Sequence, residues 1–185
     1  MANVVLVVDM LRGFKDIGNL ANPRMANIIP NIEDLLERKT KEGWKIIFLA
    51  DNHSEDDKEF ELFPTHCVKG TEETKIIQEL RRFVEAGAIV VHKKSYSGFS
   101  GTNLGKYIAM EKPEIVIVVG VCTDICVFFT TYDLVRFGYK VIVPRDAVET
   151  YDLVPGHDAD EINNVFLAQM KNILGVKIVE TQEEI

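Results

Sequence analysis

The sequence has only three cysteines, an odd number, and it opens without a basic segment or a small-residue cleavage site before its first apolar run. A disulfide framework normally uses paired cysteines in a secreted chain. We therefore expect reduced thiols, a cytoplasmic location and a fold that depends on its hydrophobic core.

Long apolar runs and an excess of positive charge are also missing. The longest apolar stretch, Ile115 to Cys122, is much shorter than the roughly 18 to 20 residues of a membrane helix. Lys and Arg number 21 against 29 Asp and Glu, a net charge of -8, which disfavours nucleic acid and anionic membranes as partners. We therefore expect no nucleic-acid partner and no association with a membrane.

The 185 residues fit one domain spanning residues 1–185, and 46% of them are hydrophobic, enough to cover both faces of a buried sheet. Short runs rich in Val and Ile predict six buried strands: Val4–Val8, Lys45–Ala50, Ala88–Val91, Ile115–Val119, Lys140–Val143 and Val176–Val179. Amphipathic segments predict helices between most of them: Met25–Lys41, Thr74–Arg82, Leu104–Met110, Asp124–Phe137 and Asp160–Leu174. Pro30 lies inside the first of these, so we expect that helix either to begin near Pro30 or to kink there. We expect Gly175 to cap the last helix and the acidic stretch Glu180–Glu184 to be a solvated tail.

This alternation predicts a three-layer α/β/α fold, with helices on both faces of a mainly parallel six-stranded sheet. Such a sheet binds ligands beyond the carboxyl ends of its strands. Reactive groups follow four predicted strands: Asp9, Asp51-Asn52-His53, His92-Lys93-Lys94 and Gly120 to Cys126.

Cys126 is the candidate nucleophile. It follows a strand and a turn in which Thr123 or Asp124 can cap a helix. In a first helical turn, unpaired N–H groups and the helix dipole lower the pKa of a thiol and can stabilise an oxyanion. For Cys122 and Cys67 the usual interpretation of a buried small hydrophobic side chain is kept.

Asp9 is a candidate proton shuttle. None of the five residues before it is charged, so burial should raise the pKa of its carboxyl. The alternative is that Asp9 only caps a turn or bonds to the backbone. Lys93 or its neighbour Lys94 could supply an ammonium that holds Asp9 ionised. Because side chains alternate along a strand, only one of the two lysines can face the nucleophile.

Asp51, His53 and His66 form a candidate metal site, because carboxylate and imidazole ligands suit Zn²⁺, Mn²⁺ or Fe²⁺. The Asp-x-His spacing at a strand end puts two ligands on one side of the backbone. His66 lies 13 residues after His53, close enough for the loop between them to fold back. No thiolate pair accompanies them, which favours an open site that keeps a water over a closed structural one.

Taken together, these residues resemble the isochorismatase-like cysteine hydrolases, and among them the nicotinamidases. The resemblance runs along nearly the whole chain in several separate motifs. The motifs are Val7-Val8-Asp9 with Phe14, Asp51-Asn52-His53, the segment Phe63 to Thr71, Lys93 with Tyr96 to Phe99, Gly101-Thr102, and Gly120 to Val127.

The resemblance implies a catalytic triad of Asp9, Lys93 and Cys126, with Lys93 chosen over its neighbour by the family spacing. It also implies a cis peptide between Val121 and Cys122, which would turn the amides of Cys122 and Cys126 into an oxyanion hole.

One divalent ion is implied as well, with Zn²⁺ favoured over Mn²⁺ or Fe²⁺. Its ligands would be Asp51, His53 and His66, with Glu59 as a possible fourth. The substrate pocket would be formed by Phe14, Phe63, Tyr96 and Val121.

The expected activity is hydrolysis of nicotinamide to nicotinate and ammonia, a step of NAD salvage, by a homo-oligomer. A related C–N hydrolase, such as an N-carbamoylsarcosine-amidase-like enzyme, is the nearest alternative because it would use the same triad. Cleavage of a vinyl ether, the isochorismatase reaction, fits less well because those enzymes lack the thiol and the metal histidines. A non-catalytic metal-binding protein with the same fold is the alternative from a different class.

Overall fold

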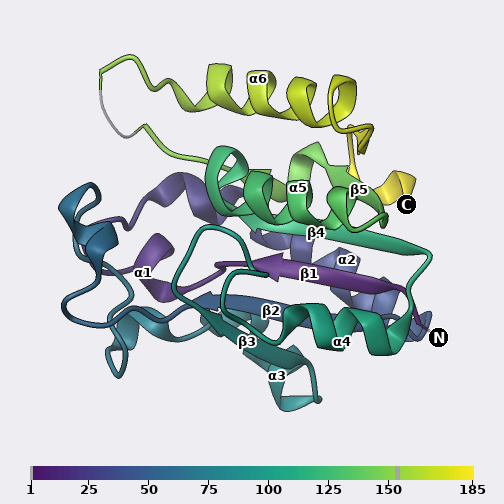
Figure 1. Cartoon of the computed structure of the whole chain (residues 1–185), viewed down its shortest axis with the longest axis horizontal. Coiled ribbons are helices and arrows are strands. Elements are labelled where there is room, and N and C mark those ends of the chain that lie inside the picture. The colour runs from purple at the N-terminus through teal and green to yellow at the C-terminus, as the bar shows by residue number, and fades with distance from the viewer. Residues whose placement is uncertain (1, 153–154) are drawn as a thin grey trace.

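Parallel strands form the centre of the computed structural model, which describes residues 2–152 and 155–185 (Figure 1). Within these residues the sheet has seven strands: β1 (Val4–Val8), β2 (Lys45–Asp51), β3 (Ile89–Lys93), β4 (Ile115–Val121), β5 (Lys140–Pro144), β6 (Val148–Glu149) and β7 (Lys177–Val179). Their order is β3-β2-β1-β4-β5-β7, with β6 beside β4, and every pairing is parallel. The predicted fold class is confirmed. The six-strand count missed β6, because two residues are too short to show a periodicity.

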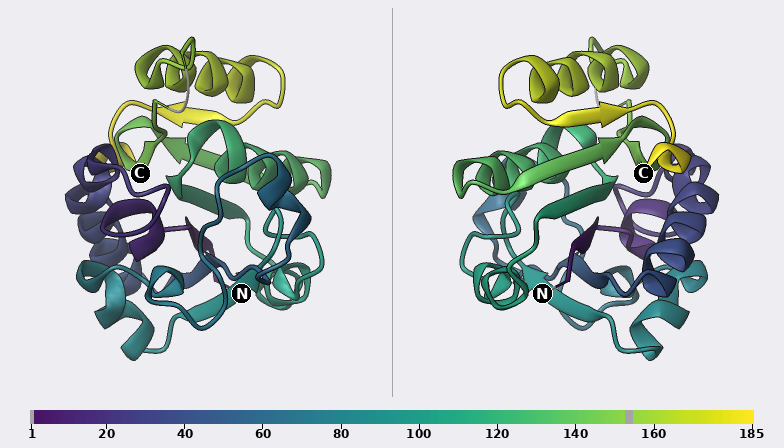
Figure 2. Two further views of the ribbon diagram at one scale, coloured as in Figure 1. Left: turned by 90° about the vertical axis from the view of Figure 1, so that its left-hand side faces the viewer. Right: turned by 90° about the vertical axis from the view of Figure 1, so that its right-hand side faces the viewer.

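Helices cover both faces of this sheet (Figure 2). Their bounds are α1 Arg12–Lys15, α2 Ile29–Lys41, α3 Arg81–Glu85, α4 Leu104–Glu111, α5 Phe128–Arg136 and α6 Ala159–Asn172. The first three pack on one face and the last three on the other. In the part of the chain described, no helix has the length and apolar character needed to cross a membrane.

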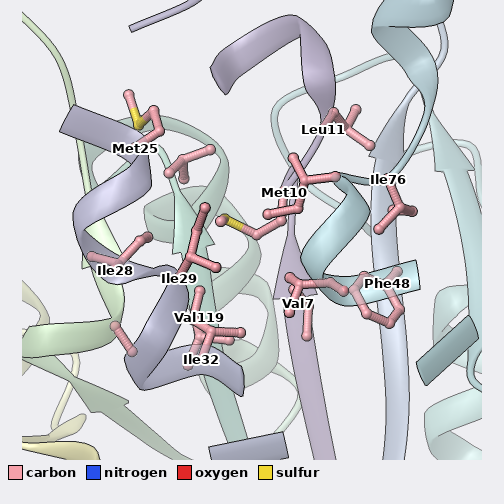
Figure 3. Packing of buried hydrophobic residues seen from close by; sticks show 14 of the residues in the cluster. Val7, Met10, Leu11, Met25, Ile28, Ile29, Ile32, Phe48, Ile76 and Val119 are labelled. Atoms are coloured by element: carbon pink, nitrogen blue, oxygen red, sulfur yellow. The ribbon is translucent and has the colours of Figure 1, made fainter. Parts of the chain in front are cut away.

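The two hydrophobic cores follow from the alternation of side chains along each strand. In β1, Val5 and Val7 face the α2 side, whereas Val4, Leu6 and Val8 face the α4–α6 side, and all five are fully buried. Figure 3 shows the first core, in which side chains of the α2 region pack against the sheet. Because burial of each such side chain contributes about 1.5–3 kcal/mol, the apolar runs that predict the strands also hold the layers together.

Two helix predictions need correction. The helix expected from Met25 begins only at Ile29, which confirms the alternative of a start near Pro30, because proline lacks an N–H and is tolerated only in a first turn. Residues Pro23–Ile28 form a 3₁₀ helix instead. The expected helix Thr74–Arg82 is replaced by short 3₁₀ turns and α3. Its backbone pairs elsewhere, since Arg12 donates to the Lys75 carbonyl and Ile77 donates to that of Met10.

The C-terminal predictions also change. Helix α6 has Ile173 as its C-cap, and Gly175, at φ +71°, lies in the turn beyond it. The segment Glu180–Glu184 is not a solvated tail, because it contains a 3₁₀ turn with a capping box between Thr181 and Glu184. Arg38 at the basic end of α2 donates to the carbonyls of Gln182 and Ile185, which docks this segment on the fold.

The strand order reverses between β1 and β4, which is the position where open α/β sheets bind their ligands. Gly120 near the end of β4 permits a close approach to β1, since a Cβ added there would lie 2.1 Å from the carbonyl oxygen of Val8. Asp9 and the Cys122–Cys126 turn follow directly from these two strand ends.

We expect Gly120→Ala to lower the free energy of unfolding by about 3 kcal/mol, because it combines a backbone clash with a positive φ of +112°. Gly138→Ala is the matched control. Gly138 also has a positive φ, +88°, but a Cβ there would meet no described atom within 4 Å, so its cost should be about 1 kcal/mol. Urea unfolding of both variants measures the difference, and equal costs would contradict the close approach.

Candidate active site

Three strand ends bring one ammonium and two carboxylates together. Asp51 and Lys93 are paired in register at the ends of β2 and β3, so their side chains lie on the same face of the sheet. Lys93 Nζ lies 2.8 Å from Asp9 Oδ2, 2.6 Å from Asp51 Oδ1 and 3.3 Å from Cys126 Sγ. The Asp51 N–H donates to Asp9 Oδ1 at 3.1 Å. The ammonium therefore donates hydrogen bonds to Asp51 and Cys126 and forms a close ion pair with Asp9.

The alternation along β3 determines which lysine takes this position. Lys93 is buried, whereas Lys94 is exposed and donates to the hydroxyl of Ser54. The prediction that only one lysine faces the nucleophile is confirmed, and that lysine is Lys93.

Burial and charge together set the proton affinities of the cluster. Burial and the negative charge of Asp51 raise the pKa of Asp9 to about 6, although the Lys93 ammonium opposes them. Burial alone would also raise the pKa of Asp51, but Lys93 and the two imidazoles hold it well below its usual range. Burial alone would lower the pKa of Lys93, yet Asp51 and Asp9 hold it above its usual range. Lys93 is therefore a fixed positive charge, and Asp9 is the carboxylate able to exchange a proton.

Cys126 lies in a π-helical turn, Thr123–Val127, that precedes α5. The expected side-chain cap from Thr123 or Asp124 is not there, because the N-cap residue is Cys122, without a side-chain hydrogen bond. Burial raises the pKa of the Cys126 thiol well above its usual range, although Lys93 opposes this. The expectation of a lowered pKa is therefore wrong, since desolvation by burial outweighs the Lys93 ammonium. The resting thiol is therefore protonated and needs a base. A carboxylate is close enough to serve, because the side-chain ligand atoms of Asp9, Asp51 and Cys126 lie within 4.8 Å of one another.

The peptide bond between Val121 and Cys122 is cis, as the resemblance implies. The Cys122 carbonyl accepts hydrogen bonds from the N–H groups of Ile125 and Val127, both at 3.1 Å. These bonds fold the turn so that Cys122 and Cys126 both line the pocket described below.

Asp51, His53 and His66 come together because the loop after β2 folds back on itself. The His53 N–H donates to the Cys67 carbonyl, and the Lys69 N–H donates to the His53 carbonyl, which brings His66 beside His53. The ligand atoms of the three residues lie within 4.8 Å of one another, with Nε2 of each imidazole 3.6–3.8 Å from an Asp51 oxygen.

The donor set fits a divalent cation. His53 Nε2 is buried without a hydrogen-bond partner among the described residues, as expected for an atom that would ligate a metal. The opposite ring nitrogens are held, His53 Nδ1 by Asp57 at 3.2 Å and His66 Nδ1 by the Pro64 carbonyl at 2.8 Å. Glu59 Oε1 lies 3.7 Å from His66 Nε2, close enough to serve as a fourth ligand.

A second acidic group, formed by Asp9, Asp51 and Cys126, is also compact enough to bind a metal. The Lys93 ammonium already contacts all three side chains, so it is the cation of that group. The metal site and the thiol cluster thus share Asp51 and lie side by side.

A pocket opens above the cluster and contains about 300 Å³ of empty space, its open mouth included. Three of its walls are the predicted aromatics Phe14, Phe63 and Tyr96. Val121 was also predicted to line the pocket, but it is buried in the core on the α2 side, and Cys122 lines the pocket instead.

Sequence reasoning missed other lining residues, namely Leu20, Ile125 and Tyr151. Tyr151 follows β6, the strand that was also missed, so no sequence signal pointed to it. Asp57 was missed as the partner of His53, although its position four residues later was a usable signal.

The fold and site define a parallel α/β protein whose pocket combines a thiol, an ammonium and a carboxylate with candidate metal ligands. The model of the isochorismatase domain matches residues 3–176, so this chain belongs to the isochorismatase family of hydrolases.

Three solved structures are similar to it over nearly their whole length. The N-carbamoylsarcosine amidase from Thermoplasma acidophilum is 29% identical, with a TM-score of 0.85 and coverage of 100% of this chain and 99% of that one. The pyrazinamidase/nicotinamidase from Streptococcus mutans UA159 is 28% identical, with a TM-score of 0.87 and coverage of 96% and 100%. The pyrazinamidase of Pyrococcus horikoshii in complex with zinc is 28% identical, with a TM-score of 0.81 and coverage of 97% and 99%.

Proposed function

We propose that this protein is a cysteine amidohydrolase that converts nicotinamide, or a closely similar aromatic carboxamide, to the carboxylate and ammonia. The observation that carries the proposal is the contact of one ammonium with Cys126, Asp9 and Asp51 at the floor of an aromatic pocket. The similarity to amidases acting on such substrates supports it.

The chemistry of the pocket walls favours a neutral aromatic amide over an acidic substrate. Among the described residues that line it, none is Lys or Arg, and Asp51 and Glu59 contribute negative charge. The Lys93 ammonium is already engaged by two carboxylates. A substrate carboxylate, such as that of N-carbamoylsarcosine, would therefore find no free side-chain cation among these residues to pair with.

The residues divide the reaction into two steps. Asp9 Oδ2, which accepts no well-aligned hydrogen bond from the described residues, takes the thiol proton of Cys126. Sulfur then bonds to the carboxamide carbon as the C=O π pair moves to oxygen, where the amides of Cys122 and Cys126 would stabilise it. The oxyanion reforms the carbonyl, the C–N bond breaks, and Asp9 returns the proton to the departing ammonia.

A thioester remains on Cys126, and water completes the cycle. Asp9 accepts a proton from the attacking water, the C–S bond breaks, and the sulfur of Cys126 recovers that proton. Lys93 remains protonated throughout and stabilises the thiolate that forms in each half of the reaction.

Asp51, His53 and His66, with Glu59 nearby, would hold a divalent metal ion beside this cluster. A bound Zn²⁺, Mn²⁺ or Fe²⁺ would supply a Lewis acid able to fix the pyridine nitrogen of the substrate or a water.

Ammonia release from a panel of amides tests the substrate assignment. Nicotinamide and pyrazinamide should be turned over with a kcat/KM at least about tenfold above that for N-carbamoylsarcosine, because no free side-chain cation among the described pocket residues pairs with its carboxylate and a tenfold difference needs only about 1.4 kcal/mol. A higher kcat/KM for N-carbamoylsarcosine would instead support the alternative C–N hydrolase. Absence of turnover on every amide would favour a metal-binding protein without activity.

We expect the purified protein to bind about one Zn²⁺ per chain, and His53→Ala to weaken binding by at least about 100-fold because it removes a ligand. His92→Ala is the matched control, since His92 is exposed on β3 and should leave the affinity unchanged. Calorimetric titration of the metal-free proteins with Zn²⁺ measures both values. Equal affinity in wild type and His53→Ala would contradict the site.

A further inference from the structure

Asp124 is a largely buried carboxylate near the nucleophile, and it has no part in the proton transfers of the proposed reaction. It lies between Cys122 and Cys126, and its side chain is 9% exposed. Both carboxylate oxygens have partners: the Thr150 hydroxyl donates to Oδ1 at 2.6 Å, and His157 Nε2 lies 3.1 Å from Oδ2.

The direction of this carboxylate is unusual for its place in the sequence. An Asp at a helix start normally accepts hydrogen bonds from the first backbone N–H groups, yet this turn has no side-chain cap. Asp124 instead reaches across to the segment after β6. Its bonds therefore connect the turn to another part of the fold rather than satisfying the turn itself.

The segment it reaches is firmly anchored. Strand β6 pairs with the last residues of β4, Gly120 with Val148 and Val121 with Glu149. Thr150 is fully buried, and its N–H donates to the Glu149 carboxylate at 2.9 Å. Backbone pairing thus ends at Val121, and the Asp124–Thr150 bond continues the connection through side chains.

We propose that Asp124, held by Thr150 and His157, is a positioning residue that fixes the turn so that the amides of Cys122 and Cys126 point together at the substrate carbonyl. The inference rests on the proposed cysteine-hydrolase function and deepens it. Asp124 exchanges no proton and touches no substrate. Asp124 acts on the stability of the oxyanion, which exists only after sulfur has attacked the substrate. Loss of the Asp124 side chain should therefore lower kcat more than it raises KM.

The size of the effect follows from what one oxyanion donor contributes. Removing such a donor costs about 10²–10³-fold in kcat, and a misaligned donor costs part of that. We expect Asp124→Ala to lower kcat about 100-fold and Thr150→Val about tenfold, with KM changed less than about threefold in both. Thr150→Ser keeps the hydroxyl and should stay within about threefold of wild type.

Thr131→Val is the matched control for Thr150→Val. Thr131 is also fully buried, but its hydroxyl has no hydrogen-bond partner among the described residues. The same isosteric change there should leave kcat unchanged. Urea unfolding identifies any variant whose lost activity reflects lost structure, and Thr150→Val keeps the test available should Asp124→Ala not fold.

Two reagents distinguish a misplaced oxyanion site from a thiol that has itself become less reactive. Pyridine-3-carbaldehyde is expected to bind reversibly, as sulfur bonds to the aldehyde carbon, the thiol proton passes to Asp9 and the new oxyanion rests on the two amides. Iodoacetamide alkylates sulfur with loss of iodide and needs no oxyanion site. In Asp124→Ala the aldehyde affinity should fall in parallel with kcat, while the alkylation rate of Cys126 stays within about twofold of wild type.

The positioning role is supported if kcat and aldehyde affinity fall together in the folded Asp124→Ala and Thr150→Val proteins and Thr150→Ser restores both. It is overturned if either folded variant keeps full kcat, or if kcat falls while the aldehyde affinity does not. A wild-type protein that hydrolyses no amide overturns the proposed function as well, and that failure is recognised before any variant is compared.

Discussion

Cys126→Ala should lower ammonia release from nicotinamide by at least about 10⁴-fold while the protein stays folded, because the variant removes the only protein atom that bonds to the substrate carbon. The pocket walls and the Asp9–Lys93 ion pair remain in this variant. Nicotinamide should therefore still bind, and its affinity can be measured by calorimetry.

The control for this variant is Cys67→Ala, which removes another buried thiol from a position that does not line the pocket. Its kcat should stay within about threefold of wild type. More than about 1% of the wild-type rate in Cys126→Ala would assign the chemistry to another group, such as an attacking water, and would refute covalent catalysis by the thiol.

Lys93→Met should be the most destabilising change in the site, lowering the free energy of unfolding by about 3–5 kcal/mol. Methionine approximates the length of lysine, but it leaves the buried carboxylates Asp9 and Asp51 without their shared cation. Turnover should be lost as well, because the thiolate also loses its ion-pair partner. Lys94→Met tests the neighbouring lysine, which is exposed, and should change the stability by less than about 0.5 kcal/mol.

A double variant separates the charge from the packing of Lys93. Asp9→Asn removes one of the two uncompensated charges, so Asp9→Asn/Lys93→Met should be more stable than Lys93→Met alone. Urea unfolding of the single and double variants gives the coupling free energy. A double variant less stable than Lys93→Met would mean that packing, rather than charge, accounts for the loss.

Much of this site could be predicted from the sequence because parallel strands bring their carboxyl ends to one edge. Asp9, Asp51 and Lys93 each end or follow an apolar run, and the register of β2 with β3 makes Asp51 and Lys93 neighbours. Side-chain alternation predicts that only one of Lys93 and Lys94 faces the nucleophile, and the resemblance to the family chooses Lys93. The fold-back that joins His53 to His66 was expected from the length of the loop.

The features that escaped prediction depend on contacts between distant segments. The pKa of Cys126 is raised because the complete fold buries the thiol, which its place near a helix start did not indicate. Strand β6 has only two residues, so it and the Tyr151 wall that follows had no periodic signal. Asp124 was expected as a cap, but its partner Thr150 lies 26 residues away in the sequence. Local patterns identify the reactive groups, whereas packing determines their protonation and orientation.

The most direct test of the central claim is the rate of ammonia release when purified wild-type protein, loaded with Zn²⁺, is mixed with nicotinamide, with Cys126→Ala measured in parallel. The proposed function predicts steady release of ammonia and nicotinate in equal amounts by the wild type and none above background by the variant. No release by the folded, metal-loaded wild type, or equal release by both proteins, would contradict it.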